Sequence, residues 1–368
     1  MLVLICVHLA SSLRRAQHGA HDESYDGTTT AQLFATLKRA SDLTNQSGAG
    51  RQLSFRHVTK YGASFWLAVG PTGPAEQGKY SAALPAGGIN NKLYQSGRFH
   101  EHAEAKLVQR ILESQCALHQ RTGTTRGLVV DVGANSGFFT LLGAAHGCNV
   151  ISMEPNKAWA ALVNLSVAAN GFASRVTLHN AVATNERNVV FNGWEVAHDT
   201  ASTYQTKGKK RSWASPQGSV RLDDVLPPGQ PIVYLKIDTQ GHEGPVLASA
   251  QRVLLSGLVR FIFLEVTFTF MGEARFEKAL PHIRLLAEQL QYQFYLPPNS
   301  PLLKASKNQA NLHQGRKYTA LPSGSRLLGW LRDSASNLPK TTYAAADLIA
   351  VHPSSHPAWE RMMDLSWH

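Results

Sequence analysis

The sequence predicts an α/β protein with a doubly wound, mainly parallel sheet and an irregular N-terminal extension. Three observations support this fold class. Short apolar, mostly β-branched runs recur after residue 128, segments with helical spacing separate them, and glycine turns join the two kinds of segment. Alternation of this kind forms a parallel sheet with helices on both faces. A ligand is therefore expected at the carboxyl ends of the strands.

The expected elements follow one another from residue 99 to the C-terminal region. Strands are expected at residues 128–133, 149–154, 176–182, 232–237 and 259–266, with a small extra strand at 188–191. Helices are expected at residues 99–119, 136–146, 157–170, 244–256 and 273–290. A final antiparallel pair is expected from residues 292–296 and 347–352.

Composition divides the chain into three parts. Residues 1–50 hold an apolar start and a polar linker, residues 51–98 form an N-terminal extension, and residues 99–368 form the main domain. An insertion at about 298–342, rich in Lys, Ser, Asn and Gly, precedes the last strand. A loop of that length is usually functional or disordered.

The apolar start allows two locations for the protein. The run Met1–Ala10 is too short to span a bilayer, so no spanning segment is predicted there. Ala10–Ser12 offers a small-residue cleavage site, but Arg14 and Arg15 follow the apolar run instead of preceding it. The secretory pathway is expected if Met1–Ser12 is a signal peptide, and the cytoplasm otherwise. A buried first strand or a truncated gene model would look similar.

The chain is strongly basic, with a formal net charge of +11 and a pI near 9.6. This charge suggests acidic partners or merely a basic surface. The densest basic cluster consists of Lys207, Lys209, Lys210 and Arg211. A solvated loop explains this cluster better than a nucleic-acid contact, because no aromatic interleaving or nucleic-acid module accompanies it.

The three cysteines, Cys6, Cys116 and Cys148, do not suggest a disulfide framework. Cys148 stands at the start of an expected buried strand and is interpreted as a small core residue. No Cys/His spacing resembles a zinc site, so no metal site is predicted.

The stretch after the first strand reads Val-Val-Asp-Val-Gly-Ala-Asn-Ser-Gly-Phe-Phe-Thr. Gly133 permits a sharp turn, and a helix whose positive end faces the turn can begin near Ser136 and Gly137. An anionic or polar ligand suits that position. Ala134 takes the place of the second glycine in a dinucleotide fingerprint, which argues against NAD. A strand–helix connection without a ligand is the alternative.

Two acids favour one cofactor. Asp131 precedes the turn, and Glu154 ends the second strand, where an acid can accept hydrogen bonds from ribose hydroxyls. Such a pair suits a cofactor with a ribose and an ammonium group but no pyrophosphate. S-adenosylmethionine has this chemistry.

The fourth strand ends in a second group of titratable residues: Asp238, His242 and Glu243. They border the cofactor crevice, because the fourth strand lies beside the first in this architecture. Without a catalytic role, Asp238 would cap the following helix and the other two would occupy its first turn.

These motifs resemble the FkbM-type methyltransferases that depend on S-adenosylmethionine. The resemblance covers roughly residues 100–270 and rests on the following segments: residues 130–140, Glu154-Pro155-Asn156, Leu222-Asp223-Asp224, Lys236-Ile237-Asp238 and Gly241-His242-Glu243. It implies the Rossmann-like class I methyltransferase fold, with a seven-stranded sheet and the cofactor over the first glycine turn.

The resemblance also assigns cofactor-binding residues. Asp131, Gly133, Ala134, Asn135 and Gly137 would cradle the methionine part. Glu154, with Asn156 in the same motif, would hold the ribose hydroxyls, and Asn180 and Ala181 would lie near the adenine.

The acceptor implied by the family is a hydroxyl oxygen of a small molecule or a sugar. Two alternatives are an RNA or other nucleic-acid methyltransferase and a catalytically inactive binding protein. The first is disfavoured because residues 238–241 do not form the Asn/Asp-Pro-Pro-aromatic motif of amine methylation. The second is suggested by Thr239 and Gln240, since the family usually has a hydrophobic residue and then Glu at these positions.

Methylation of a hydroxyl is helped by a base that takes its proton. His242 is the expected base because the unperturbed pKa of histidine, about 6.5, lies nearest neutral pH. Asp238 would orient the acceptor, or would itself be the base in apolar surroundings. Glu243 would hold the imidazole tautomer or simply favour the helix N-terminus.

Overall fold

The computed structural model describes residues 54–69, 102–122, 126–191, 194–197, 200–203, 217–270, 273–298, 300–305, 318–338 and 343–364. The apolar start, the polar linker and the basic cluster at residues 207–211 lie outside these ranges, so the expectations for them remain predictions.

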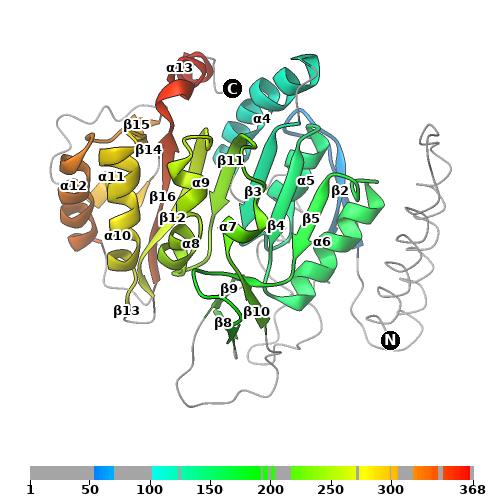
Figure 1. Ribbon diagram of the computed structural model, residues 1–368, viewed down its shortest axis with the longest axis horizontal. Coiled ribbons are helices and arrows are strands. Elements are labelled where there is room, and N and C mark those ends of the chain that lie inside the picture. Colours follow the sequence, from blue (N-terminus) through cyan, green and yellow to red (C-terminus); the bar gives the residue numbers. More distant parts are fainter. Residues whose placement is uncertain are drawn as a thin grey trace.

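A mainly parallel sheet forms the centre of the described chain and confirms the predicted fold class (Figure 1). Its order is β15 (Thr319–Ala320), β14 (Gln293–Leu296), β16 (Tyr343–Val351), β12 (Phe261–Phe270), β11 (Ile232–Ile237), β3 (Leu128–Val132), β4 (Asn149–Met153) and β5 (Val176–His179). Strands β12, β11, β3, β4 and β5 run parallel, whereas β14 and β16 form the expected antiparallel pair. The two-residue strands β15 and β13 (Glu273–Ala274) extend the seven longer strands.

Helices cover both faces of this sheet and enclose two hydrophobic cores. One face carries α4 (His102–Thr122), α5 (Phe138–Ala145), α6 (Lys157–Ala169) and α13 (His356–Asp364). The other carries α7 (Leu222–Val225), α8 (Glu243–Ser249), α9 (Gln251–Leu255), α10 (Phe276–Arg284) and α12 (Ser325–Ser336). In β3 the side chains alternate: Val130 and Val132 enter the second core and Val129 the first, so Asp131 points toward α5.

Several boundaries differ from the expected ones. The helix expected at residues 244–256 divides into α8 and α9 at Ala250, and the one at 273–290 becomes β13, α10 and the π-helical turn η1 (Leu285–Gln289). The strand expected at 176–182 ends at His179, and Val182–Ala183 forms β6 in a separate sheet. These breaks depend on tertiary packing, which overrides local propensity.

The insertion before the last strand contains regular structure in its described parts. It holds α11 (Pro301–Ala305), β15 and α12. Leu327, Leu328 and Leu331 of α12 are buried in the core shared with α10, which their helical spacing explains. This part of the insertion is therefore not the irregular loop that its composition suggested.

The described part of the N-terminal extension is an antiparallel hairpin of β1 (Ser54–Val58) and β2 (Phe65–Val69). Phe65 and Leu67 enter the core under α5. The backbone of Ala68 donates a hydrogen bond to Ser166 Oγ of α6 (2.8 Å), which ties the hairpin to the main domain.

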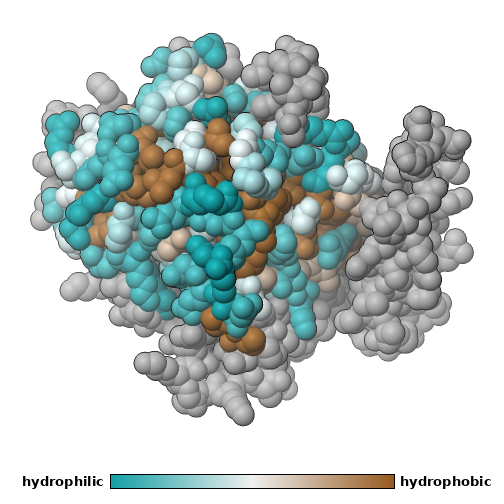
Figure 2. All heavy atoms as spheres, in the orientation of Figure 1, coloured by the Kyte–Doolittle hydropathy of each residue, from teal (hydrophilic) through white to brown (hydrophobic). Residues whose placement is uncertain are grey.

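Smaller strands gather where the parallel strands of the central sheet end, at the lower edge in Figure 1. Strands β6, β7 (Val190–Phe191) and β10 (Gln217–Val220) form one small sheet, and β8 (Trp194–Ala197) pairs with β9 (Thr200–Thr203). The extra strand expected at 188–191 is thus present as β7. Apolar residues form separate patches in Figure 2, and Val190 and Leu255 are the exposed large apolar side chains of the described residues.

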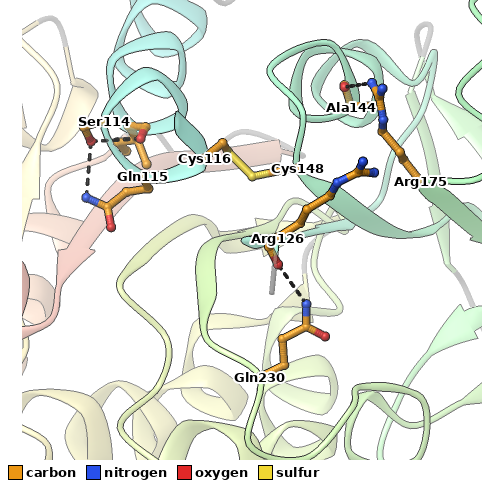
Figure 3. The surroundings of a disulfide bond; sticks show 9 residues. Ser114, Gln115, Cys116, Arg126, Ala144, Cys148, Arg175 and Gln230 are labelled. Atoms are coloured by element: carbon orange, nitrogen blue, oxygen red, sulfur yellow. Dashed lines mark hydrogen bonds between the residues drawn. A yellow bond between two sulfur atoms is a disulfide. The ribbon is translucent and has the colours of Figure 1, made fainter. Parts of the chain in front are cut away.

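A disulfide joins Cys116 of α4 to Cys148, which precedes β4 (Figure 3). Cys148 is fully buried, as expected, but the interpretation that it is a simple core residue outside any disulfide is wrong. The bond lies at the amino ends of the strands, away from the edge where a ligand is expected. It fixes α4 against the sheet, which spacing in the sequence could not reveal.

We expect loss of this cross-link to reduce the free energy of unfolding by roughly 3–4 kcal/mol, because the bond closes a loop across a sequence separation of 32 residues. Guanidinium denaturation of the wild type with and without reductant measures the effect. The Cys116→Ala/Cys148→Ala double variant, which should be insensitive to reductant, is the control. Two reactive thiols at these positions in the unreduced protein would contradict the bond.

Candidate functional site

The sequence-predicted site residues follow the ends of neighbouring parallel strands, at the edge of the sheet where β10 lies in Figure 1. Gly133 follows β3, Glu154 follows β4 and Asp238 follows β11. Because β3 lies between β4 and β11, the glycine turn is flanked on both sides by acidic residues. The arrangement agrees with the ligand position expected for a parallel sheet.

The glycine turn is fixed by backbone geometry. Gly133 has a φ of +83°, and a Cβ at this position would lie 1.8 Å from the carbonyl oxygen of Asp238. The amides of Gly133 and Ala134 both donate to Met153 O at 3.0 Å. Gly137 has a φ of +81° and lies against Val163, with 2.8 Å between an added Cβ and Cγ2. Only glycine fits either position without displacing the backbone or α6.

Glu154 connects the turn to the following loop. Its Oε2 accepts a hydrogen bond from the Asn135 backbone amide (2.7 Å), and its Oε1 accepts one from the Asn156 amide (2.8 Å). Burial raises the pKa of this carboxyl to about 7, although both amides act in the opposite direction. Asn180, beside Ala181, donates from Nδ2 to the backbone oxygen of Glu154 (2.7 Å). The four residues expected to bind ribose and adenine are therefore neighbours.

Asp131 lies fully buried beneath the turn. Its Oδ2 accepts a hydrogen bond from Thr140 Oγ1 of α5 (2.6 Å), and its Oδ1 has no hydrogen-bond partner. Burial raises its pKa, partly offset by the charge of Lys236. Asn135 Oδ1 is a second buried oxygen without a hydrogen-bond partner. These acceptors, with the Glu154 carboxyl, fit a ligand that carries an ammonium group and ribose hydroxyls.

A bridged pair of carboxyls lies at the ends of β11 and β12. Gln240, with a φ of +54°, donates from Nε2 to Asp238 Oδ1 (3.0 Å) and to Glu265 Oε2 (2.7 Å). Lys236 Nζ lies 3.0 Å from Asp238 Oδ2. Gln240 thus occupies the position between two acids, so a third acid there would add a like charge.

The two carboxyls have opposite pKa shifts. Burial alone would raise the pKa of Asp238, but the charge of Lys236 and hydrogen bonds from Glu265 and Gln240 bring it below the usual value. Burial raises the pKa of Glu265 well above its usual range, and the charges of Asp238 and Asp347 raise it further. Glu265 therefore holds a proton more readily than Asp238 does.

Glu243 accepts its side-chain hydrogen bonds from the turn that precedes α8. Its Oε1 accepts hydrogen bonds from the Gly241 amide (2.7 Å) and from Thr239 Oγ1 (3.3 Å). Burial raises its pKa to about 7. Two roles were expected for Glu243: holding the imidazole tautomer of His242, or favouring the helix N-terminus. The structure shows the second, because Glu243 lies in the first turn of α8. Asp238 does not cap that helix, since its oxygens bind Lys236 and Gln240.

His242 has surroundings that the sequence did not indicate. Its ring packs edge-on against Phe191 of β7 (5.9 Å between centroids), and its Nε2 has no hydrogen-bond partner. Burial, together with the charges of Arg275 and Lys278, lowers its pKa to about 4. His242 was expected to be the base because of the unperturbed pKa of histidine, and the structure does not retain that pKa. The imidazole is therefore neutral at pH 7.

Sequence reasoning missed Glu265 and the roles of Lys236 and Gln240. The available signal was a single acid within the apolar strand Phe261–Phe270, since a buried charge usually has a specific partner. In the described ranges no three His, Cys, Asp or Glu side chains are grouped so that they could hold a metal ion. No helix in those ranges is long and apolar enough to cross a membrane.

The fold and the site define a class I methyltransferase, a class that uses S-adenosylmethionine. The family model for the methyltransferase FkbM domain matches residues 131–294, which contain the turn, Glu154 and the Asp238–Glu265 pair. This part of the chain is therefore an FkbM methyltransferase domain. The predicted family and cofactor are thereby confirmed, while the roles of individual site residues remain predictions.

Solved structures also show similarity to this chain. The cyclase SpnF has 12% identity and a TM-score of 0.32, covering 67% of this chain and 82% of its own. A methyltransferase from Geobacter sulfurreducens in complex with S-adenosyl-L-homocysteine has 12% identity and a TM-score of 0.30, covering 67% and 98%. No curated protein matches the chain. Similarity this distant does not identify an acceptor.

We expect Gly133→Ala to destabilise the protein by roughly 2–5 kcal/mol and to abolish cofactor binding, because the methyl group meets Asp238 O at 1.8 Å in a left-handed conformation. Gly329→Ala in α12 is the control, because an added Cβ there meets nothing within 4 Å. It should stabilise the helix by about 0.5–1 kcal/mol. Denaturation and calorimetry measure both variants. Wild-type binding by Gly133→Ala would refute the tight turn.

Proposed function

We propose that the protein transfers a methyl group from S-adenosylmethionine to a hydroxyl oxygen of a small molecule or a sugar. The observation that carries this proposal is the position of Asp238. Its carboxyl, with 19% of the side chain exposed, belongs to the residue whose backbone packs against Gly133 of the cofactor turn. An ionised acid at this point can receive the proton of an acceptor hydroxyl.

The cofactor would be held by residues on three loops. Asp131 and residues 133–137 would bind the methionine part, Glu154 and Asn156 the ribose, and Asn180 and Ala181 the adenine edge. The bound cofactor supplies an electrophilic methyl group on a sulfonium. The protein then needs to orient the acceptor, exclude water and receive one proton.

Asp238 and His242 are the candidates for the base. His242 is neutral and can accept a proton, but its Nε2 has no hydrogen-bond partner that fixes its orientation. Asp238 is ionised and bound to Lys236 and Gln240, so its orientation is fixed. This geometry favours Asp238 as the base. His242 lies beside Phe191 of β7, as a neighbour of the site.

Two other functions remain for the test to separate: methylation of nucleic acid and cofactor binding without catalysis. Calorimetry with S-adenosylmethionine, followed by transfer of a tritiated methyl group to hydroxylated metabolites, glycans and RNA, distinguishes them. Transfer to a hydroxylated small molecule or glycan is the expected result. Transfer to RNA alone, or binding without any transfer, would contradict the proposal.

We also propose that the protein matures in an oxidising compartment. The disulfide between Cys116 and Cys148 supports this location, because such bonds are rare in proteins of reducing compartments. Residues Met1–Ser12 would then act as a signal peptide. Alkylation of free thiols in protein isolated from its native cells, followed by mass spectrometry, tests this. Free thiols at both positions would contradict it.

We expect cofactor affinity to rise roughly tenfold from pH 6 to pH 8 through Glu154. Its pKa is raised to about 7, and the ionised carboxyl accepts hydroxyl hydrogen bonds, so binding strengthens as the proton leaves. Glu154→Ala should weaken binding by about 1–3 kcal/mol.

Calorimetry across this pH range compares the wild type with Glu154→Gln, which keeps one acceptor oxygen but cannot ionise. The difference between the two proteins removes any titration of the cofactor itself. An equal pH dependence in both, or unchanged affinity in Glu154→Ala, would refute the ribose assignment.

A further inference from the structure

Polar side chains interrupt one apolar face of the sheet where β11 and β12 end. Along β12, Phe261 and Phe263 enter the core below α4 and α5, and alternation places Glu265 and Thr267 on the same face. Along β11, Tyr234 enters that core and Lys236 follows on the same face. Glu265, Thr267 and Lys236 thus form a row of polar side chains toward the carboxyl ends of these two strands.

Thr267 is the member of this row that lacks a partner. Its side chain is 1% exposed, and its Oγ1 is buried without a hydrogen bond. Buried hydroxyls are ordinarily hydrogen-bonded. The strand pairing of β12 with β16 shifts register between Thr267 and Thr269, which marks a bulge directly after this residue. Bulges often change the direction in which side chains point beside active sites.

We propose that Asp238 and Glu265 act as a pair that holds one proton, that Asp238 receives the acceptor's proton, and that Thr267 hydrogen-bonds the acceptor. Gln240 is the positioning residue of this pair. The inference rests on the proposed hydroxyl methylation and deepens it by naming the acceptor side of the site.

The side chain of Gln240 bridges the two carboxyls. Both contacts come from one NH₂ group, which donates to Asp238 Oδ1 at 3.0 Å and to Glu265 Oε2 at 2.7 Å. An NH₂ group can only donate, so each contacted oxygen acts as an acceptor. The amide therefore holds the two acids in place without adding charge. The charged or titratable groups that act on the pair from other positions are Lys236, Asp131, Asp347 and Glu243.

The reaction step then balances with one proton. The acceptor oxygen forms a bond to the methyl carbon while the bond from that carbon to sulfur breaks. The hydroxyl proton moves to the Asp238 carboxylate, and Glu265 retains its own proton. Lys236, 3.0 Å from Asp238 Oδ2, keeps Asp238 ionised before the step. No oxidant, metal ion or general acid is needed for this balance.

The first experiment reads the carboxyls without any acceptor. Carbon-13 NMR of protein labelled at the Asp and Glu carboxyls should show Glu265 protonated and Asp238 ionised at pH 7, with Glu265→Gln and Asp238→Asn used for assignment. Gln240→Glu should move the titration of the pair upward by about one pH unit, because it adds a like charge. Gln251→Glu, at an exposed position in α9, is the matched control and should leave the pair unchanged.

The second experiment measures turnover with whichever compound the wild type methylates fastest in a panel of hydroxylated metabolites and glycans. Gln240→Glu should shift the acid limb of kcat upward with the NMR titration. Thr267→Val should raise the acceptor KM roughly five- to tenfold with little change in kcat, whereas Thr267→Ser should retain the wild-type KM.

An ionised Glu265 at pH 7, or a Gln240→Glu titration equal to that of Gln251→Glu, would overturn the pair. Equal KM values for Thr267→Val and Thr267→Ser would overturn the acceptor contact. Loss of the acid limb in His242→Ala but not in Asp238→Asn would move the base to the imidazole. If the wild type methylates nothing in the panel, the proposed function fails, and the NMR titration still decides the carboxyl pair.

Discussion

The close approach between the turn after β3 and the end of β11 is the constraint on which the site depends. A Cβ on Gly133 would meet Asp238 O at 1.8 Å, and the Asp238 amide donates to Val132 O at 3.0 Å. Two neighbouring strands therefore end in one joined backbone structure. The same contact brings the glycine turn and the proposed base, Asp238, together, so no separate element is required to position them.

Burial of acids is the second feature that unites the site. Burial raises the pKa of four acids at this edge of the sheet: Asp131, Glu154, Glu243 and Glu265. Burying a carboxyl costs free energy unless hydrogen bonds offset it. Backbone amides bind Glu154 and Glu243, and side chains bind Asp131 and Glu265. Such perturbed groups at the open end of a parallel sheet are typical of functional sites.

The sequence predicted features that depend on local pattern. The strands, the glycine turn and the positions of Glu154 and Asp238 follow from short motifs, and the structure places them as expected. Features that depend on pairing between distant segments were not predictable. Gln240 meets Glu265 across 25 residues, and Cys116 meets Cys148 across 32. The pKa of His242 likewise depends on burial and on the charges of Arg275 and Lys278, which no local motif encodes.

The chemical identity of the methylated product tests most directly whether Asp238 supports transfer to a hydroxyl oxygen. The purified protein, S-adenosylmethionine labelled with carbon-13 in its methyl group, and a panel of hydroxylated compounds are incubated together, and the product is identified by heteronuclear NMR. We expect a labelled methyl group on oxygen in the wild type and little or none with Asp238→Asn, while both proteins bind the cofactor. A methyl group on nitrogen or carbon, or equal transfer by Asp238→Asn, would contradict it.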